Sequence, residues 1–281
     1  MPQDHQGAQR ASSRRFRSLL TGVLAALVIV TASTAGAPEA RAATAKVVIV
    51  VGPVGGSTAD YRSGARSLAT LARGYGAAVT EIYSPYATWS KVSAAAKGAN
   101  LLIYLGHGNG WPSPYAPFST KSKDGLGLNA TSGNGNRNIK YYGEYYMARL
   151  GLAPNAVVVL NRLCYASGNS EWGSANPTRS TAIERVDNYG AGFLRAGAKA
   201  VFASGITNVS YVVRGLFNES ASMTMSQLFW TDSNLTGTYK LSFTSNRTPE
   251  AAALMDPYAR NRYYRSVVGW LETTVGDWRG G

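Results

Sequence analysis

The sequence has little sulfur, few imidazoles and few acidic groups. Of its 281 residues, one is cysteine and two are histidine, and 28 Lys and Arg outnumber 15 Asp and Glu, for a formal charge of +13. A single cysteine excludes a disulfide within the chain, so the protein is not a disulfide-stapled scaffold. The sequence also lacks a dense run of basic residues, which argues against nucleic acid as a partner.

Long apolar runs are missing as well. Residues 19–30 are apolar and uncharged, but this run is shorter than the ~20 residues that a membrane span needs. The run follows a cluster of four arginines within residues 10–17 and precedes Ala40-Arg41-Ala42, a small-x-small cleavage pattern. These features predict an export signal over residues 1–42, and hence a secreted protein, in some settings associated with the cell surface, with no integral membrane span after cleavage.

Cleavage after Ala42 leaves residues 43–281, enough for one large domain with a sizeable core. The leader carries five Lys/Arg and two Asp/Glu, so its removal changes the formal charge from +13 to +10. A surface of this charge favours anionic partners such as cell-wall polymers, although solubility alone is a sufficient reason for it. The oligomeric state is not readable from these features.

Along the predicted mature chain, apolar runs alternate with amphipathic stretches. Strands are predicted at residues 47–51, 77–83, 101–105, 156–160 and 200–203. Helices are predicted at residues 58–75, 89–96, 141–150, 181–196 and 209–229, with a helical extension in 249–281 that packs on the same domain. The strands are rich in Val, Ile and Leu without alternation, which indicates a sheet buried on both faces. The predicted fold is an α/β, three-layer α/β/α sandwich with a mostly parallel sheet.

Residues 111–138 form an unusual segment, rich in Pro, Gly, Asn and Ser and without an apolar period. We expect a long loop, and because it follows His107 directly, we interpret it as a wall or lid of a site. It carries side-chain oxygens that can hold a hard cation such as calcium or simply stabilise turns, the second interpretation being preferred. They belong to Asp124, Asn129, Asn134 and Asn136. No other metal or cofactor site is predicted.

The only cysteine and the only histidine of the predicted mature chain each follow an apolar strand. His107 comes directly after residues 101–105 and a glycine, and Cys164 comes shortly after residues 156–160; the other histidine, His5, lies in the leader. Ligands of parallel sheets sit beyond the carboxyl ends of the strands, and consecutive strands are usually neighbours. The pattern therefore predicts a catalytic Cys/His dyad rather than a buried structural cysteine.

Residues next to the dyad suggest supporting roles. The N–H of Gly108, together with that of Cys164, can form an oxyanion hole. Asn161, at the end of its strand, can orient His107 or bind substrate, and Asn169 and Glu171 can line a specificity pocket; solvated strand-end and loop positions are the alternative interpretation for all three.

With its stretch Tyr104-Leu105-Gly106-His107-Gly108 and a later apolar strand leading to Cys164, the chain resembles the caspase–legumain–gingipain clan of cysteine peptidases, and gingipain- and clostripain-like enzymes in particular. The resemblance covers residues 46–205 in the order and type of elements. It implies a six-stranded, mostly parallel sheet with helices on both sides. It also implies Cys164 as nucleophile, His107 as general acid or base, Gly108 as oxyanion donor, and a peptide or protein substrate.

Two other functions are compatible with the same residues. Leu163 stands where the clan often has a small or acidic residue, and Gly168 comes one position later than the usual glycine. These departures favour a non-catalytic surface or binding protein of the same fold as one alternative. A cell-wall peptide amidase or transpeptidase is the other, because it would use the same nucleophile chemistry.

Overall fold

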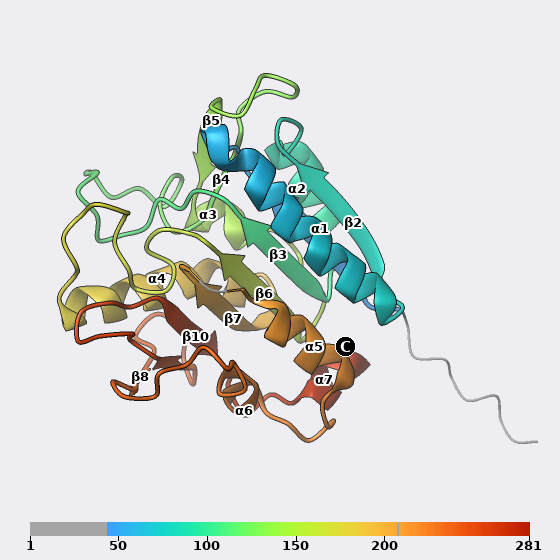
Figure 1. The fold of residues 1–281 in the computed structure, drawn as a ribbon, viewed down its shortest axis with the longest axis vertical. Helices are drawn as coiled ribbons and strands as arrows, with labels where there is room; N and C mark the ends of the chain where they lie inside the picture. The colour runs from blue at the N-terminus through green and yellow to red at the C-terminus, as the bar shows by residue number, and fades with distance from the viewer. Residues whose placement is uncertain (1–43, 207) are drawn as a thin grey trace, which may run out of the picture. The chain divides into compact units, whose positions relative to one another are not determined.

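The computed structural model describes residues 44–206 and 208–281, so the predicted export signal and His5 lie outside the described residues. A large, mostly parallel sheet forms the centre of the fold, and Figure 1 shows helices packed along it. Its eight strands follow the order β2-β1-β3-β6-β7-β10-β9-β8. The strands are β1 (Lys46–Val51), β2 (Ala78–Tyr83), β3 (Leu101–Leu105), β6 (Ala156–Asn161), β7 (Ala198–Ser204), β8 (Leu241–Thr244), β9 (Ala252–Met255) and β10 (Arg265–Gly269).

The first five strands of the sheet, β2 to β7 in spatial order, pair in parallel, and β10, β9 and β8 continue it in antiparallel fashion. All five strands predicted from the apolar runs are present in this parallel part. Strands β3 and β6 are buried at every position, as expected for strands with helices on both faces.

The helices are α1 (Thr58–Gly74), α2 (Trp89–Ala96), α3 (Glu144–Met147), α4 (Arg179–Arg195), α5 (Ser210–Asn218), α6 (Met225–Phe229) and α7 (Val275–Gly280), and a 3-10 turn, η1 (Gly55–Ser57), precedes α1. Alternate residues of β1 belong to two different hydrophobic clusters. Val48 and Val50 pack with residues of α2, α3 and α4, whereas Val47 and Ile49 pack with residues of α1, α5, α6 and α7. The sheet is thus covered on both faces.

Helix α1 illustrates how the sequence forms these layers. Its buried residues Ala65, Leu68, Ala69 and Ala72 recur at three- and four-residue spacing and turn one face to the sheet. The helix ends at Gly74, and Gly76 just beyond it has φ +84°, a left-handed conformation that favours glycine after a helix end.

Three predicted elements differ from the structure. The helix predicted over 209–229 is split into α5 and α6, because Glu219 is extended at the end of α5 and Thr224 begins a new helix with a capping box. Within 141–150 the short helix α3 follows a strand, β5 (Ile139–Tyr142). The predicted loop 111–138 contains β4 (Leu126–Asn129), which pairs with β5 as an antiparallel hairpin.

The segment 249–281 is not a helical extension. It supplies β9 and β10 to the central sheet, and only α7 at its end is helical. Strand β10 is buried throughout and pairs with β7, so this segment completes the core of the domain. In the ranges 44–206 and 208–281, no helix combines the length and the apolar character that a bilayer crossing requires.

Candidate active site

The loop after β3 carries His107 (the histidine loop, residues 106–125), and the loop after β6 carries Cys164 (the cysteine or nucleophile loop, residues 162–178). Both loops leave the sheet from neighbouring strands at the same edge. Strands β3 and β6 are parallel and in direct register, with Leu105 opposite Asn161. His107 follows two residues after Leu105, and Cys164 three residues after Asn161. The expected adjacency of the two strands is therefore confirmed, and the chain folds so that the two loops meet.

The contact between the loops is made at Gly108. A Cβ atom added to this glycine would lie 2.5 Å from the carbonyl oxygen of Cys164 and 2.5 Å from the hydroxyl of Tyr189. Real side chains do not approach so closely, so only glycine allows the two loops to pack at this distance. Gly108 is buried in this contact.

The backbone of His107 is held while its side chain stays exposed. Its carbonyl oxygen accepts a hydrogen bond from the Gly127 N–H at 3.1 Å and lies 3.0 Å from the hydroxyl of the fully buried Tyr104. That hydroxyl also donates to the carbonyl of Gly127 at 2.6 Å. Partial desolvation lowers the pKa of His107, against the opposing effect of the Glu171 charge. The imidazole is therefore neutral at pH 7.

Cys164 is half-buried and free. Burial, followed by the charge of Glu171, raises the pKa of its thiol to about 11, while a hydrogen bond from the backbone of Trp172 acts in the opposite direction. The thiol is therefore protonated at pH 7. In the part of the chain that the structure describes, no hydrogen bond joins His107 to Cys164, so the pair is neutral rather than a thiolate–imidazolium ion pair.

The backbone around Cys164 is strained. Arg162 and Tyr165, two and one residues away, have φ +60° and +72°, in the left-handed region that L-residues other than glycine rarely adopt. Such a conformation costs roughly 1–2 kcal/mol per residue. It is maintained by the packing of the loop: the Arg162 N–H donates to the Ser204 carbonyl at 2.6 Å, and the Tyr165 ring is buried beside Arg185. Strain of this kind is concentrated at functional sites in proteins.

One backbone amide in each of the two contacting loops has no acceptor in the described chain. Within residues 44–206 and 208–281, neither the Gly108 N–H nor the Cys164 N–H donates a hydrogen bond. Buried backbone donors are nearly always paired in native proteins. Gly108 is buried and does not line the cavity beside Cys164, so its N–H is an interior donor without a partner among the described residues.

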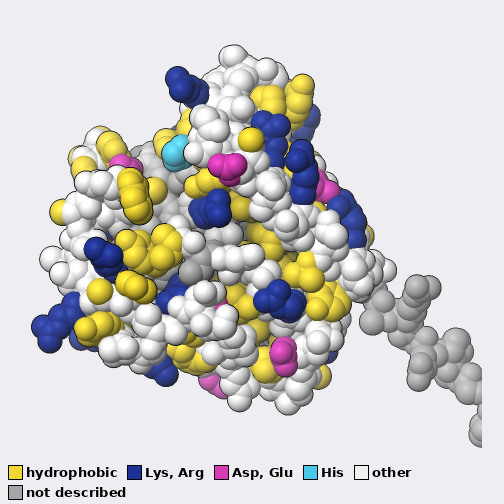
Figure 2. All heavy atoms as spheres, viewed as in Figure 1, with side chains coloured by type: hydrophobic (Ala, Val, Ile, Leu, Met, Phe, Trp, Pro, Cys, Tyr) yellow, Lys and Arg dark blue, Asp and Glu magenta, His cyan; other side chains and the backbone are white. Residues whose placement is uncertain are grey.

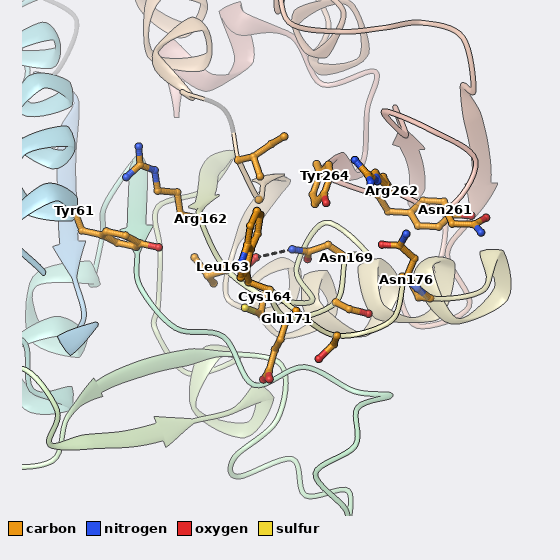
Figure 3. Close-up of a pocket in the computed structure, with 18 residues that line it drawn as sticks. Tyr61, Arg162, Leu163, Cys164, Asn169, Glu171, Asn176, Asn261, Arg262 and Tyr264 are labelled. Carbon is orange, nitrogen blue, oxygen red and sulfur yellow. Dashed lines mark hydrogen bonds between the residues drawn. The ribbon is translucent and has the colours of Figure 1, made fainter. Parts of the chain in front are cut away.

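A cavity of about 590 Å³ opens beside Cys164 (Figure 3). It is lined by the loop that follows Cys164, by Tyr61 of α1 and by the turn between β9 and β10. Of the predicted site residues, Cys164, Asn169 and Glu171 line the cavity, whereas His107, Gly108 and Asn161 do not. The cavity thus extends to one side of the nucleophile loop, away from the histidine loop.

The predicted substrate-binding residues have different surroundings. Asn161 is buried at the end of β6, and its Oδ1 has no partner among the described residues. The side-chain Nδ2 of Asn169 donates to the Leu163 carbonyl at 3.4 Å. The backbone carbonyl of Asn169 accepts a hydrogen bond from Arg185 at 2.8 Å. These bonds hold Asn169 as part of the frame of the loop. The carboxylate of Glu171 accepts a hydrogen bond from Tyr115 at 2.8 Å.

The sequence reasoning missed the residues that connect the two loops. The Nε of Arg185 donates to the Pro112 carbonyl at 2.7 Å on the histidine loop, and its NH1 bonds the cysteine loop at Asn169. Tyr115 bonds Glu171 across the same gap. Arg185 lies inside helix α4, and Tyr115 lies in a loop with no periodic pattern, so neither residue type nor spacing gave a signal.

Three of the four residues considered for calcium use a side-chain oxygen in a hydrogen bond within the protein. Asp124 accepts from the Trp111 N–H at 2.9 Å, Asn129 from the Ala87 N–H at 3.2 Å, and Asn136 from the Ser84 hydroxyl at 2.9 Å. These bonds stabilise turns. Over the described ranges, no group of three or more His, Cys, Asp or Glu side chains is arranged to hold a metal ion.

Positive charge is spread rather than concentrated on the face that Figure 2 shows. Figure 2 shows Lys and Arg side chains scattered over the visible face, interspersed with apolar and uncharged polar groups.

Neither protein-family models nor curated proteins give a match to this sequence. Function is therefore inferred from the chemistry of the site itself.

Proposed function

We propose that the protein is a cysteine-type endopeptidase that hydrolyses peptide bonds with Cys164 as nucleophile and His107 as general acid and base. The observation that carries this proposal is the packing of Gly108 against Cys164 at the ends of two adjacent parallel strands. It brings the loop of the only described histidine into contact with the loop of the only cysteine, and one backbone N–H in each loop, that of Gly108 and that of Cys164, donates no hydrogen bond within the described chain.

The resting charges define how the reaction would begin. With a thiol pKa of about 11, about one cysteine in ten thousand is ionised at pH 7, so direct attack by a preformed thiolate is rare. The neutral imidazole of His107 takes the thiol proton as the sulfur attacks the substrate carbonyl. The resulting imidazolium then protonates the leaving amine, and the C–N bond breaks to leave an acyl-enzyme thioester.

Water completes the cycle. His107 accepts a proton from the water that attacks the thioester, and the proton returns to the sulfur when the acid product leaves. In both halves of the reaction the carbonyl oxygen becomes negatively charged. The N–H groups of Gly108 and Cys164 are the donors that would stabilise it, a contribution of about 3–4 kcal/mol for a single donor in acyl-transfer enzymes.

A caspase-like fold is part of this proposal. It is supported by the five parallel strands, the helices on both faces and the position of the two loops at neighbouring strand ends. The sheet has eight strands instead of the six that the resemblance implies, because β9 and β8 extend the antiparallel side. We further propose that the enzyme acts outside the cell after removal of residues 1–42, on peptide or protein substrates, with anionic cell-wall polymers as candidate surface partners.

Substitution of the two side chains tests the proposal. In a peptide-library assay, Cys164→Ala is expected to abolish cleavage and His107→Ala to reduce it by at least about 100-fold. Thermal unfolding of both variants should stay within about 1–2 kcal/mol of the parent, since neither residue is fully buried. The peptidase assignment is lost if Cys164→Ala still cleaves peptides at the parent rate.

A non-catalytic binding protein is the second candidate, and a specific observation favours it: the thiol is protonated and makes no hydrogen bond to His107 within the described chain. A peptide aldehyde distinguishes the two functions. Protection of Cys164 from alkylation by the aldehyde supports the enzyme, whereas a thiol that reacts only after unfolding supports the binding protein.

A further inference from the structure

A hydrogen bond ties the histidine loop to the cysteine loop. The Tyr115 hydroxyl, eight residues after His107, donates to Oε2 of Glu171, seven residues after Cys164, at 2.8 Å. Glu171 lines the cavity beside Cys164, where the sequence predicts a specificity pocket. In Figure 3 its carboxylate points toward the ribbon of the neighbouring loop, away from Asn176 and Tyr264 on the far side of the cavity.

The Glu171 carboxylate interacts electrostatically with several titratable groups around His107 and Cys164. Its charge acts on both reacting groups, His107 and Cys164. The other titratable groups that face it come from several elements: Tyr115 and Lys123 of the histidine loop, Tyr141 of β5, Tyr165 of the cysteine loop and Arg185 of α4. Among the acidic residues that the structure describes, Glu171 is the one whose charge acts on both His107 and Cys164.

The tyrosine that holds Glu171 is itself supported. The Lys123 ammonium lies 5.6 Å from the centre of the Tyr115 ring and 5.8 Å from that of Trp111. Lys123 is nearly inaccessible to solvent, and its Nζ donates to Asn109 Oδ1 at 2.8 Å and to Ser113 Oγ at 3.0 Å. The ammonium, the ring and the carboxylate form a connected set, and Tyr165 next to Cys164 also interacts with the carboxylate, so Glu171 is bound from both loops.

We propose that Glu171 is a positioning residue: held by Tyr115 across the gap between the two loops, its carboxylate keeps His107 and Cys164 in register and supplies the counter-charge for proton transfer between them. The catalytic meaning of this role rests on the proposed peptidase function. A negative charge stabilises the imidazolium that forms when His107 takes the thiol proton. The same charge disfavours a thiolate that forms without the imidazolium, so proton transfer and attack become linked.

The experiment uses the fact that the predicted mature chain has one histidine and one cysteine. The ring proton resonance of His107 followed by NMR reports its titration, and the pH dependence of iodoacetamide alkylation reports that of Cys164. Glu171→Gln removes the charge while its amide oxygen can still accept the Tyr115 hydroxyl. We expect both titrations to move to lower pH, with alkylation at pH 7 faster by roughly 3- to 10-fold.

Turnover should change in the opposite direction. Glu171→Gln is expected to lower kcat/KM and to move the acid limb of its pH profile to lower pH, by the same amount as the His107 titration. Tyr115→Phe keeps the charge but releases its position, so it should lower kcat with little shift in either titration. Glu272→Gln, at an exposed position, serves as the matched control and should leave all of these measurements unchanged.

The outcomes separate this inference from the proposed function. If wild type cleaves peptides and Glu171→Gln changes only KM, with both titrations unmoved, Glu171 is a substrate contact and the inference fails while the peptidase stands. If both titrations move but wild type cleaves no peptide, the coupling of the two side chains stands and the peptidase function fails.

Discussion

Gly108 packs so closely against the carbonyl oxygen of Cys164 that a single added carbon atom would come within 2.5 Å of it. The two residues are 56 positions apart in the sequence, yet each occupies the first turn beyond a strand of the central sheet. Their contact makes the geometry of the nucleophile loop dependent on the histidine loop. Changes in either loop should therefore alter the reactivity of the thiol.

Gly108→Ala tests this dependence. The new methyl group would clash with both the Cys164 carbonyl and the buried Tyr189 hydroxyl, so we expect a loss of about 1–3 kcal/mol in the free energy of unfolding and at least about a 10-fold loss in kcat/KM. Urea unfolding and peptide hydrolysis measure the two effects. Gly56→Ala is the matched control, because an added Cβ there meets no atom within 4 Å. Equal behaviour of the two variants would contradict the packing argument.

The second prediction concerns the Tyr104 hydroxyl, which hydrogen-bonds the backbone carbonyls of His107 and Gly127. Tyr104→Phe removes a donor to the Gly127 carbonyl in the buried interior, while the Gly127 N–H keeps the His107 carbonyl as an acceptor. Leaving buried polar groups unpaired costs about 1–3 kcal/mol, and we expect a loss of this size on thermal unfolding. Tyr258→Phe, at an exposed ring, should have no effect. A Tyr104→Phe protein as stable as the parent would show that water replaces the hydroxyl.

Asp124 should make stability depend on pH. Burial, and next the nearby Glu144 charge, raise its pKa to about 7 from an ordinary value of 3.8, although the Trp111 N–H bond opposes the shift. The folded state then holds a proton that the unfolded chain releases above pH 4. This group therefore contributes its full stability below pH 4, and the contribution is lost as the pH rises to 7.

Asp124→Asn isolates this effect. Asparagine tolerates the φ of +60° at this position and can still accept the Trp111 N–H, so the fold is retained. We expect the variant to match the parent near pH 4 and to exceed it by about 2–4 kcal/mol above pH 7, measured by urea unfolding across that range. Asp60→Asn, at an exposed carboxylate, is the control. A parent and variant with parallel pH curves would disprove the raised pKa.

The charges that line the cavity predict a preference for the charge of the substrate. Its charged lining residues are Arg162, Arg262 and Glu171, and within the described chain neither guanidinium forms a salt bridge. The carboxylate of Glu171 is bound by Tyr115. We therefore expect peptides with an acidic side chain next to the scissile bond to be cleaved faster than matched peptides with a basic one, with a preference that weakens at high salt.

Arg162→Gly is the matching variant for this measurement. It removes the guanidinium, and glycine adopts the φ of +60° without strain, so the backbone is expected to stay in place. The ratio of kcat/KM for acidic over basic peptides should fall by roughly 3- to 10-fold, while Arg162→Lys should retain most of the preference. Faster cleavage of basic peptides by the parent would overturn the expectation.

Much of the fold follows from local sequence patterns. The runs at Lys46–Val51, Leu101–Leu105 and Ala156–Asn161 consist mainly of Val, Ile and Leu, and each forms a parallel strand that is buried at nearly every position. Helix α1 has its buried residues at helical spacing and ends near a glycine. Short strands in polar surroundings were not predicted from the sequence. Strand β4 contains a single Leu-Gly-Leu-Asn stretch, and its pairing with β5 depends on a partner rather than on its own composition.

The position of His107 and Cys164 at the ends of buried strands is determined by the sequence alone, because apolar runs define strands and the residues after them lie at the edge of the sheet. Only the tertiary structure decided that β3 and β6 are neighbours, that β10 joins the sheet from the far end of the chain, and that Tyr115 reaches Glu171. Local patterns encode each element through periodicity and burial. Contacts between loops arise from which strand ends meet in the folded sheet, and no short stretch of sequence carries that information.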